Sequence, residues 1–208
     1  MTPPRIYCSG PLFCAEEVGG MSAIAQQLEH AGFQTFLPHR DGLEPYVMQL
    51  GNTPLPGPLS AIRTRIDHAI FALDVYELIE RCDAVVCNLN GRVPDEGMIV
   101  EAALAYAAGK PLVLFKDDVR APFGGFDNAM LTSLVKGRIV GMLSGIPAAV
   151  RAELAGKQRG VVNLSPDLVE AVRQGRNISR ALAALPRRLG KQQWDEAVIR
   201  QVLEAGWG

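Results

Sequence analysis

Carboxylates set among apolar residues are the first sign of chemistry in this chain. Glu101 is the only ionisable carboxylate in the otherwise apolar run from Met98 to Ala108. Burying a carboxylate in such surroundings is costly unless the group is paired, hydrogen-bonded or used in a reaction. Asp95 and Glu96 stand at the entrance to the same run. A structural alternative stays open, in which Asp95 caps a helix and Glu101 meets an arginine, but the composition favours a catalytic Glu101.

Asp74 is a further carboxylate among apolar residues, because the segments 70–73 and 75–76 on either side of it are apolar. The composition alone favours neither of two interpretations of Asp74: a functional aspartate, or an ordinary aspartate on a helix surface.

Several other kinds of site are not indicated. The three histidines lack the spacing of metal ligands, and the four cysteines include no C-x-x-C pair. The turn from Gly10 to Phe13 lacks the G-x-G-x-x-G pattern of dinucleotide-binding proteins, and the chain has no P-loop.

What remains is a set of carboxylates and a tyrosine, which suits displacement at the anomeric carbon of a sugar. One carboxylate attacks that carbon while another protonates the leaving group. A leaving purine or pyrimidine needs its ring protonated, and a carboxylic acid with a raised pKa can do this.

The totals describe an ordinary globular protein. The chain has 208 residues, 48% of them hydrophobic and 21% charged, and a net charge of -1. No block of like charges suggests a nucleic-acid or membrane partner. The N-terminus shows no signal-peptide core, so we expect a cytoplasmic location.

Apolar runs and helix stops predict an α/β fold with a five-stranded parallel sheet and helices on both faces, similar to flavodoxin-like and Rossmann-like folds. The expected strands are 6–9, 33–37, 84–89, 112–115 and 138–143, and the expected helices of the core are 15–31, 61–82, 98–108 and 129–136.

The segment 38–60 is rich in glycine and proline and is predicted to be a loop, placed as a lid over the site. We expect an α/β domain over residues 1–143 and a helical C-terminal extension over 144–208, with helices near 165–175, 179–185 and 194–205.

The order of several elements resembles the nucleoside 2-deoxyribosyltransferase family, whose superfamily includes the 2'-deoxynucleoside 5'-monophosphate N-hydrolases. The resemblance covers roughly residues 5–143, and its most specific part is the D-x-G-x-x-x-E pattern from Asp95 through Gly97 to Glu101. The other matching elements are Ile6-Tyr7 with Phe13, Asp74, the segment 82–86, and Gly109-Lys110-Pro111.

The resemblance implies a role for each matching residue and no cofactor or metal. Glu101 would be the nucleophile, Tyr7 would hydrogen-bond its carboxylate, and Asp74 and Asp95 would bind the base and move its proton. The remaining expected substrate contacts are Phe13, Ser9, Gly10, Gly97, Asn128 and Met130.

In this family Asn128 and Met130 would reach the substrate of a neighbouring subunit, so we expect a homo-oligomer. The expected partners are nucleosides and free nucleobases. Two other functions stay open: an N-glycoside hydrolase acting on a nucleoside or its 5'-monophosphate, and a non-catalytic nucleotide sensor.

Overall fold

The computed structural model describes residues 2–47, 62–91, 93–121, 123, 126–156, 163–185 and 196–207. The chain divides into two compact units: Met1–Leu37 with Leu78–Asn163, and Pro38–Glu77 with Leu164–Gly208. The predicted division after residue 143 does not coincide with these units, because residues 38–77 group with the C-terminal helices. In the described ranges, no helix is both long enough and apolar enough to cross a membrane.

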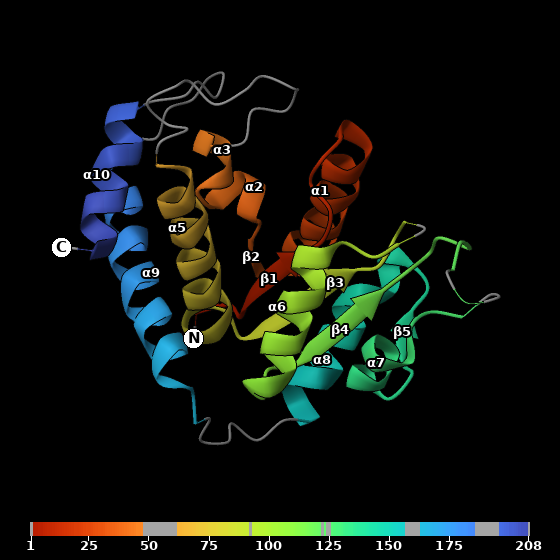
Figure 1. The fold of residues 1–208 in the computed structure, drawn as a ribbon. Helices are drawn as coiled ribbons and strands as arrows, with labels where there is room; N and C mark the ends of the chain where they lie inside the picture. Colours follow the sequence, from red (N-terminus) through yellow and green to blue (C-terminus); the bar gives the residue numbers. More distant parts are fainter. Residues whose placement is uncertain are drawn as a thin grey trace. The chain divides into compact units, whose positions relative to one another are not determined.

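The first unit is built on a five-stranded parallel sheet, which confirms the predicted fold class (Figure 1). Its strands are β1 (Arg5–Ser9), β2 (Gln34–Phe36), β3 (Ala84–Asn88), β4 (Leu112–Phe115) and β5 (Ile139–Val140). The order across the sheet is β2-β1-β3-β4-β5. The fifth strand is shorter than predicted, because only two of its residues follow the ladder of β4.

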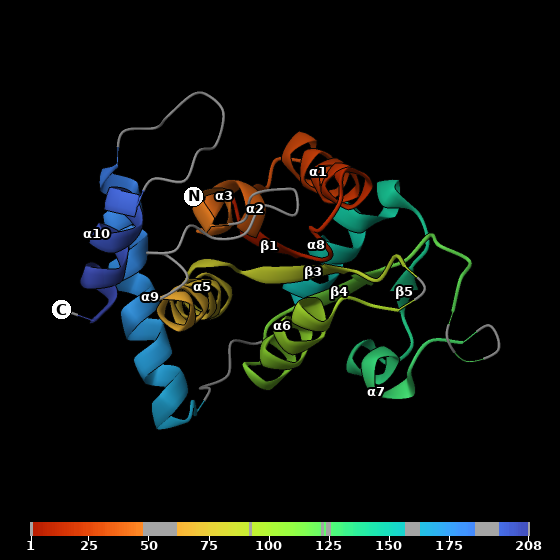
Figure 2. The same cartoon turned by 45° about the horizontal axis from the view of Figure 1, so that its top comes forward.

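Helices cover both faces of this sheet. Figure 2 shows α1 (Ala15–His30) and α8 (Ile146–Gly156) on one side and α6 (Glu96–Ala107) with α7 (Ala129–Thr132) on the other. Short 3-10 turns, η2 (Ser133–Val135) and η3 (Leu143–Gly145), lie next to α7 and α8. Helix α8 was predicted to be part of the C-terminal extension, but it packs on the sheet of the first unit.

Alternation along the strands creates two separate cores. Ile6 and Cys8 of β1 point into the core beneath α1 and α8, together with Val86 of β3. Tyr7 of β1 and Cys87 of β3 point into the core beneath α6 and α7. Because side chains two positions apart share a face, Ser9 lies on the same face as Tyr7.

This strand order has a switch point between β1 and β3. The chain leaves these two neighbouring strands toward opposite faces of the sheet, since α1 follows β1 and α6 follows β3. Ligands of open parallel sheets bind in the crevice at such a point, outside the carboxyl ends of the strands.

The second unit is helical. It contains α2 (Pro38–Asp41), α3 (Glu44–Val47), α5 (Arg63–Tyr76), α9 (Pro166–Ala184) and α10 (Glu196–Trp207). The prediction of a loop from 38 to 60 was wrong at its start, because proline is well tolerated in the first turn of a helix. Residues 48–60 of that prediction lie outside the described residues. A π-helical turn, η1 (Glu77–Arg81), continues from α5, so the predicted helix to residue 82 is largely confirmed.

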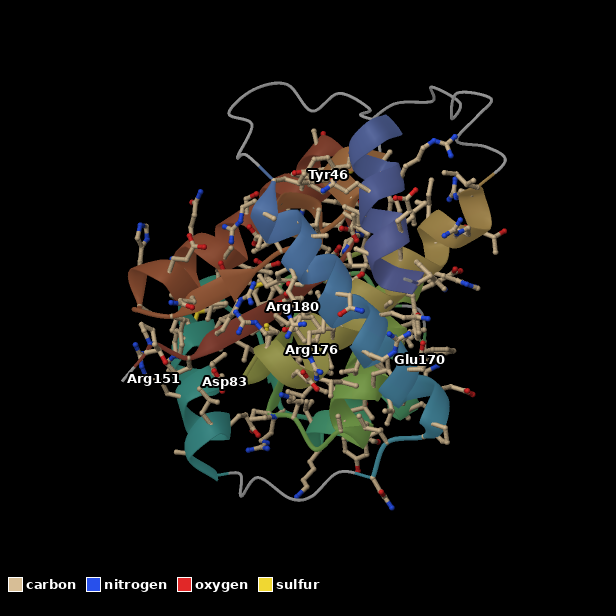
Figure 3. All side chains as sticks on the ribbon, turned by 90° about the vertical axis from the view of Figure 1, so that its left-hand side faces the viewer. Tyr46, Asp83, Arg151, Glu170, Arg176 and Arg180 are labelled. Carbon is tan, nitrogen blue, oxygen red and sulfur yellow. The ribbon has the colours of Figure 1, made fainter. Side chains whose placement is uncertain are left out.

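Helix α9 packs closely on α5. A Cβ at Gly175 would lie 2.0 Å from the carbonyl oxygen of Ala72, so only glycine allows this approach. Ser179 donates to Glu77, and the Arg176 guanidinium lies over the ring of Tyr76; Figure 3 labels Arg176 and Arg180 along α9. The predicted end of this helix near Gly175 was therefore wrong: the glycine marks a contact between helices, and α9 continues.

Candidate active site

A cavity of about 390 Å³ opens at the switch point of the sheet. Three chain segments line it: the turn after β1, the start of α1, and the connection from β3 into α6. Its lining residues are Pro11, Phe13, Glu17, Asn90, Gly91, Val93, Pro94, Asp95, Glu96 and Gly97. The lining combines apolar side chains with three carboxylates, as a site for a polar ring compound requires.

The Glu101 carboxylate is held by two hydroxyl groups from strand β1. The Tyr7 hydroxyl donates to Oε1 of Glu101 at 2.6 Å, and the Ser9 hydroxyl donates to Oε2. The Tyr7 ring stacks on Phe36 with centroids 5.4 Å apart, which fixes its direction. The predicted contact between Tyr7 and Glu101 is thus present, and the carboxylate has one defined orientation.

Glu101 lies about one helical turn from the cavity lining. Glu101 follows Gly97 by four residues, so both lie on one face of α6. Side chains of a helix lean toward its N-terminus, and Glu101 therefore leans over the turn that contains Gly97. Gly97 lines the cavity, whereas Glu101 is not among the described residues that line it.

The surroundings of Glu101 favour its protonated form. Its pKa is raised from 4.5 to about 7, mainly by burial and to a smaller degree by the nearby charge of Asp95. The hydrogen bonds from Ser9 and Tyr7 act in the opposite direction and lower the pKa. A carboxyl group poised near neutrality is typical of a reacting group.

Asp95 caps α6 and lines the cavity at the same time. Its Oδ2 accepts the backbone N–H of Met98 at 2.7 Å, which satisfies one of the free donors at the start of the helix. The capping role that was left open in the sequence is therefore real. Asp95 also lines the cavity, where its carboxylate can contact a ligand.

The turn after β1 places Phe13 at the cavity. Its side chain is 69% exposed, and its backbone N–H donates to Oε2 of Glu17 at 2.8 Å. Gly10 allows close packing here, because a Cβ at this position would lie 2.5 Å from Sδ of Met21 and 2.9 Å from Cβ of Asn88.

Loops at the carboxyl ends of β3 and β4 are tied together beside the cavity. The Asn90 side chain donates to Asp117 at 2.6 Å and accepts the backbone N–H groups of Asp117 and Asp118. Lys116 forms a buried ion pair with Asp127 at 2.5 Å, which anchors the segment leading into α7.

Asn128 and Met130 occupy the first turn of α7 and its cap. Asn128 caps the helix by accepting the backbone N–H of Met130 at 2.9 Å, and the Met130 side chain is 83% exposed. Asp74 lies half-buried on α5 in the second unit. The first unit thus brings together Tyr7, Ser9, Asp95 and Glu101, whereas the roles of Asp74, Asn128 and Met130 stay predictions.

Of the lining residues, Phe13, Asp95 and Gly97 were predicted as site residues, and the others, including Glu17 and Asn90, were not. Glu17 had a readable signal, since it stands three residues after the helix cap Cys14, as in a capping box. Asn90 had a weaker one, as a polar residue just beyond the end of a buried strand. The bond from Ser9 to Glu101 was also missed, although Tyr7 and Ser9 are two apart on one strand.

The chain was compared with known proteins and families. A family model described as nucleoside 2-deoxyribosyltransferase matches residues 6–130. A curated adenine phosphoribosyltransferase from Butyrivibrio fibrisolvens is 34% identical over 82 residues, covering 38% of this chain and 46% of the relative. The chain thus spans less than half the length of that relative.

Two solved structures align with parts of this chain. A conserved protein from Enterococcus faecalis V583 aligns with a TM-score of 0.49 and 18% identity, over 72% of this chain and 98% of that one. A 2-deoxyribosyltransferase from Bacillus psychrosaccharolyticus aligns with a TM-score of 0.41 and 21% identity, over 62% of this chain and 80% of that one.

Proposed function

Because the chain belongs to the nucleoside 2-deoxyribosyltransferase family, we propose that it exchanges purine or pyrimidine bases on nucleosides through a covalent glycosyl-enzyme. One observation carries this proposal. The partly buried carboxylate of Glu101 is fixed by Tyr7 and Ser9, and the helix that carries it begins at a cavity lined by Asp95.

In the first half of the reaction, an oxygen of the Glu101 carboxylate forms a bond to C1' of the sugar. The bond from C1' to the base nitrogen breaks, and its electron pair goes to the base. Asp95 and Asp74 bind the base and supply the proton that makes it a better leaving group. Tyr7 keeps the attacking carboxylate in line during this step.

In the second half, another base enters the cavity and its ring nitrogen attacks C1'. The ester bond to Glu101 breaks, the carboxylate is regenerated, and a carboxylate at the base takes up the proton of the incoming ring. Two displacements at one carbon give net retention of configuration. Attack by water instead gives hydrolysis.

The cavity lining supports these roles. Phe13 offers an exposed aromatic face against which a base or sugar can pack. Gly97 allows a substrate to approach the helix backbone closely.

The working enzyme is proposed to be a homo-oligomer in which Asn128 and Met130 contact the substrate of a neighbouring subunit. The exposed position of Met130 supports this, since a large apolar side chain standing in water suggests a partner surface. The ion pair between Lys116 and Asp127 would hold this segment in place.

The test is incubation with deoxyinosine, with and without adenine, followed by chromatography. Deoxyadenosine that forms only when adenine is present supports base transfer. Free hypoxanthine released at the same rate without an acceptor contradicts transfer and supports hydrolysis. Tight binding without turnover contradicts both and supports a sensor.

A further inference from the structure

The Ser9 side chain is in hydrogen-bond contact with the Glu101 carboxylate. It is the last residue of β1 and is only 1% exposed. Tyr7 and Ser9 share one face of the strand, and each hydroxyl donates to a different oxygen of Glu101. Both oxygens of the carboxylate are therefore fixed by hydrogen bonds from one strand.

The single proton of Ser9 is committed to this contact. An ionised carboxylate only accepts hydrogen bonds, so the Ser9 hydroxyl must be the donor. After donating, the hydroxyl retains only lone pairs for other partners. A substrate hydroxyl would therefore have to compete with Glu101 for the Ser9 proton.

Cys87 is a buried neighbour of Ser9 and stands opposite it in the register of β1 and β3. Burial and the charge of Glu101 raise the pKa of the Cys87 thiol, so the sulfur keeps its proton.

We propose that Ser9 is a positioning residue that fixes the second oxygen of the Glu101 carboxylate and favours the ionised, nucleophilic form. This inference rests on the proposed role of Glu101 as the nucleophile. It assigns Ser9 a task different from the substrate contact expected from the sequence. Consistent with it, the Ser9 hydrogen bond lowers the pKa of Glu101 against the effect of burial.

The direct test is the titration of the Glu101 carboxyl group by NMR in protein labelled with ¹³C at glutamate side chains. The Glu101→Gln variant identifies the resonance. Removing a hydrogen bond to a charged group should raise the pKa by about one unit or more in Ser9→Ala. The matched control is Ser22→Ala, whose hydroxyl bonds only to Val18 O within α1 among the described contacts.

An unchanged Glu101 titration in folded Ser9→Ala would overturn the proposal. Far-UV circular dichroism of both variants checks folding, and the change removes only a hydroxyl group. The titration needs no turnover, so it tests the contact even if the proposed reaction is not found.

Kinetics then separate positioning from substrate contact. In Ser9→Ala, the acid side of the pH profile of kcat/KM should move upward with the pKa, giving about a tenfold loss below neutral pH and recovery at alkaline pH. KM at alkaline pH should stay near that of the unaltered protein. A raised KM with no movement of the acid side would show that Ser9 contacts substrate instead, and would contradict the proposal.

Discussion

The protonation state of Glu101 links the stability of this protein to its proposed chemistry. As a nucleophile Glu101 must be ionised, yet burial favours the neutral acid. Tyr7 and Ser9 offset part of that cost by donating to both carboxylate oxygens. Two opposite pH effects at a single residue follow from this arrangement.

The first effect concerns activity. With the Glu101 pKa at about 7, the fraction of active enzyme should fall tenfold for each pH unit well below neutrality. We expect the acid side of the kcat/KM profile to have its midpoint near this pKa. A midpoint near 4.5, the value of a solvent-exposed glutamate, would contradict the environment described for Glu101.

The second effect concerns stability. The Glu101 carboxyl titrates near 4.5 when exposed and at about 7 when folded. Between these values the folded protein binds more protons than the unfolded chain, so stability falls as pH rises. Glu101→Gln removes the ionisation and should increase the free energy of unfolding above neutral pH by up to about 3 kcal/mol, which raises Tm by several degrees.

Thermal unfolding of Glu101→Gln and the unaltered protein at several pH values measures this effect. The two Tm curves should converge below about pH 4.5, where both side chains are neutral. A variant that is less stable at every pH would indicate that the carboxylate is mainly structural. The variant should also lack turnover.

At the residue level, the sequence predicted the main carboxylate but not all of its contacts. Glu101 stood out because its neighbours are apolar, and Tyr7 was implied by a family resemblance. Ser9 was predicted only as a substrate contact, which stays a prediction, and its bond to Glu101 was missed because the sequence does not show which way a small hydroxyl points.

At the level of elements, the approach of α9 to α5 depends on one glycine. A methyl group at position 175 would overlap the backbone of Ala72, and a backbone atom cannot move aside as a flexible side chain can. We expect Gly175→Ala to lower the free energy of unfolding by about 2 kcal/mol or more.

Gly19→Ala provides the matched control for Gly175→Ala. Gly19 also lies inside a helix, α1, but its added methyl group would meet nothing within 4 Å. Alanine has the higher helix propensity, so this change should be neutral or stabilising by up to ~1 kcal/mol. Equal effects of the two changes in urea unfolding would contradict the packing account.

The elements themselves were predictable to different degrees. Strands β1, β3 and β4 are short apolar runs ended by polar residues or glycine, and their positions were predicted to within a residue or two. The helices α2 and α3 were missed, because proline and glycine suggest a loop unless the three-dimensional context shows that proline begins a helix. The length of α9 was missed because Gly175 is explained only by a contact distant in sequence.

At the level of the whole molecule, the proposal of a shared active site can be tested by complementation. Glu101→Ala removes the nucleophile, and Asn128→Ala removes the residue proposed to serve the neighbouring subunit. Each variant alone should lose most activity. Mixed and allowed to exchange subunits, they should regain up to about a quarter of the activity, since half of the dimers are mixed and each has one intact site of two.

No gain on mixing, although subunit exchange is demonstrated by native mass spectrometry, would show that Asn128 serves its own subunit or none. The control is a mixture of Glu101→Ala with Glu101→Gln, which contains no intact nucleophile and should stay inactive.

The central claim is that the Glu101 carboxylate bonds to the sugar carbon. Its most direct test is acid quenching of the protein during turnover of a deoxynucleoside, followed by protease digestion and mass spectrometry. We predict one deoxyribosyl group on the peptide that contains Glu101, and none in Glu101→Gln. Base exchange without any adduct, or an adduct on another residue, would contradict the claim.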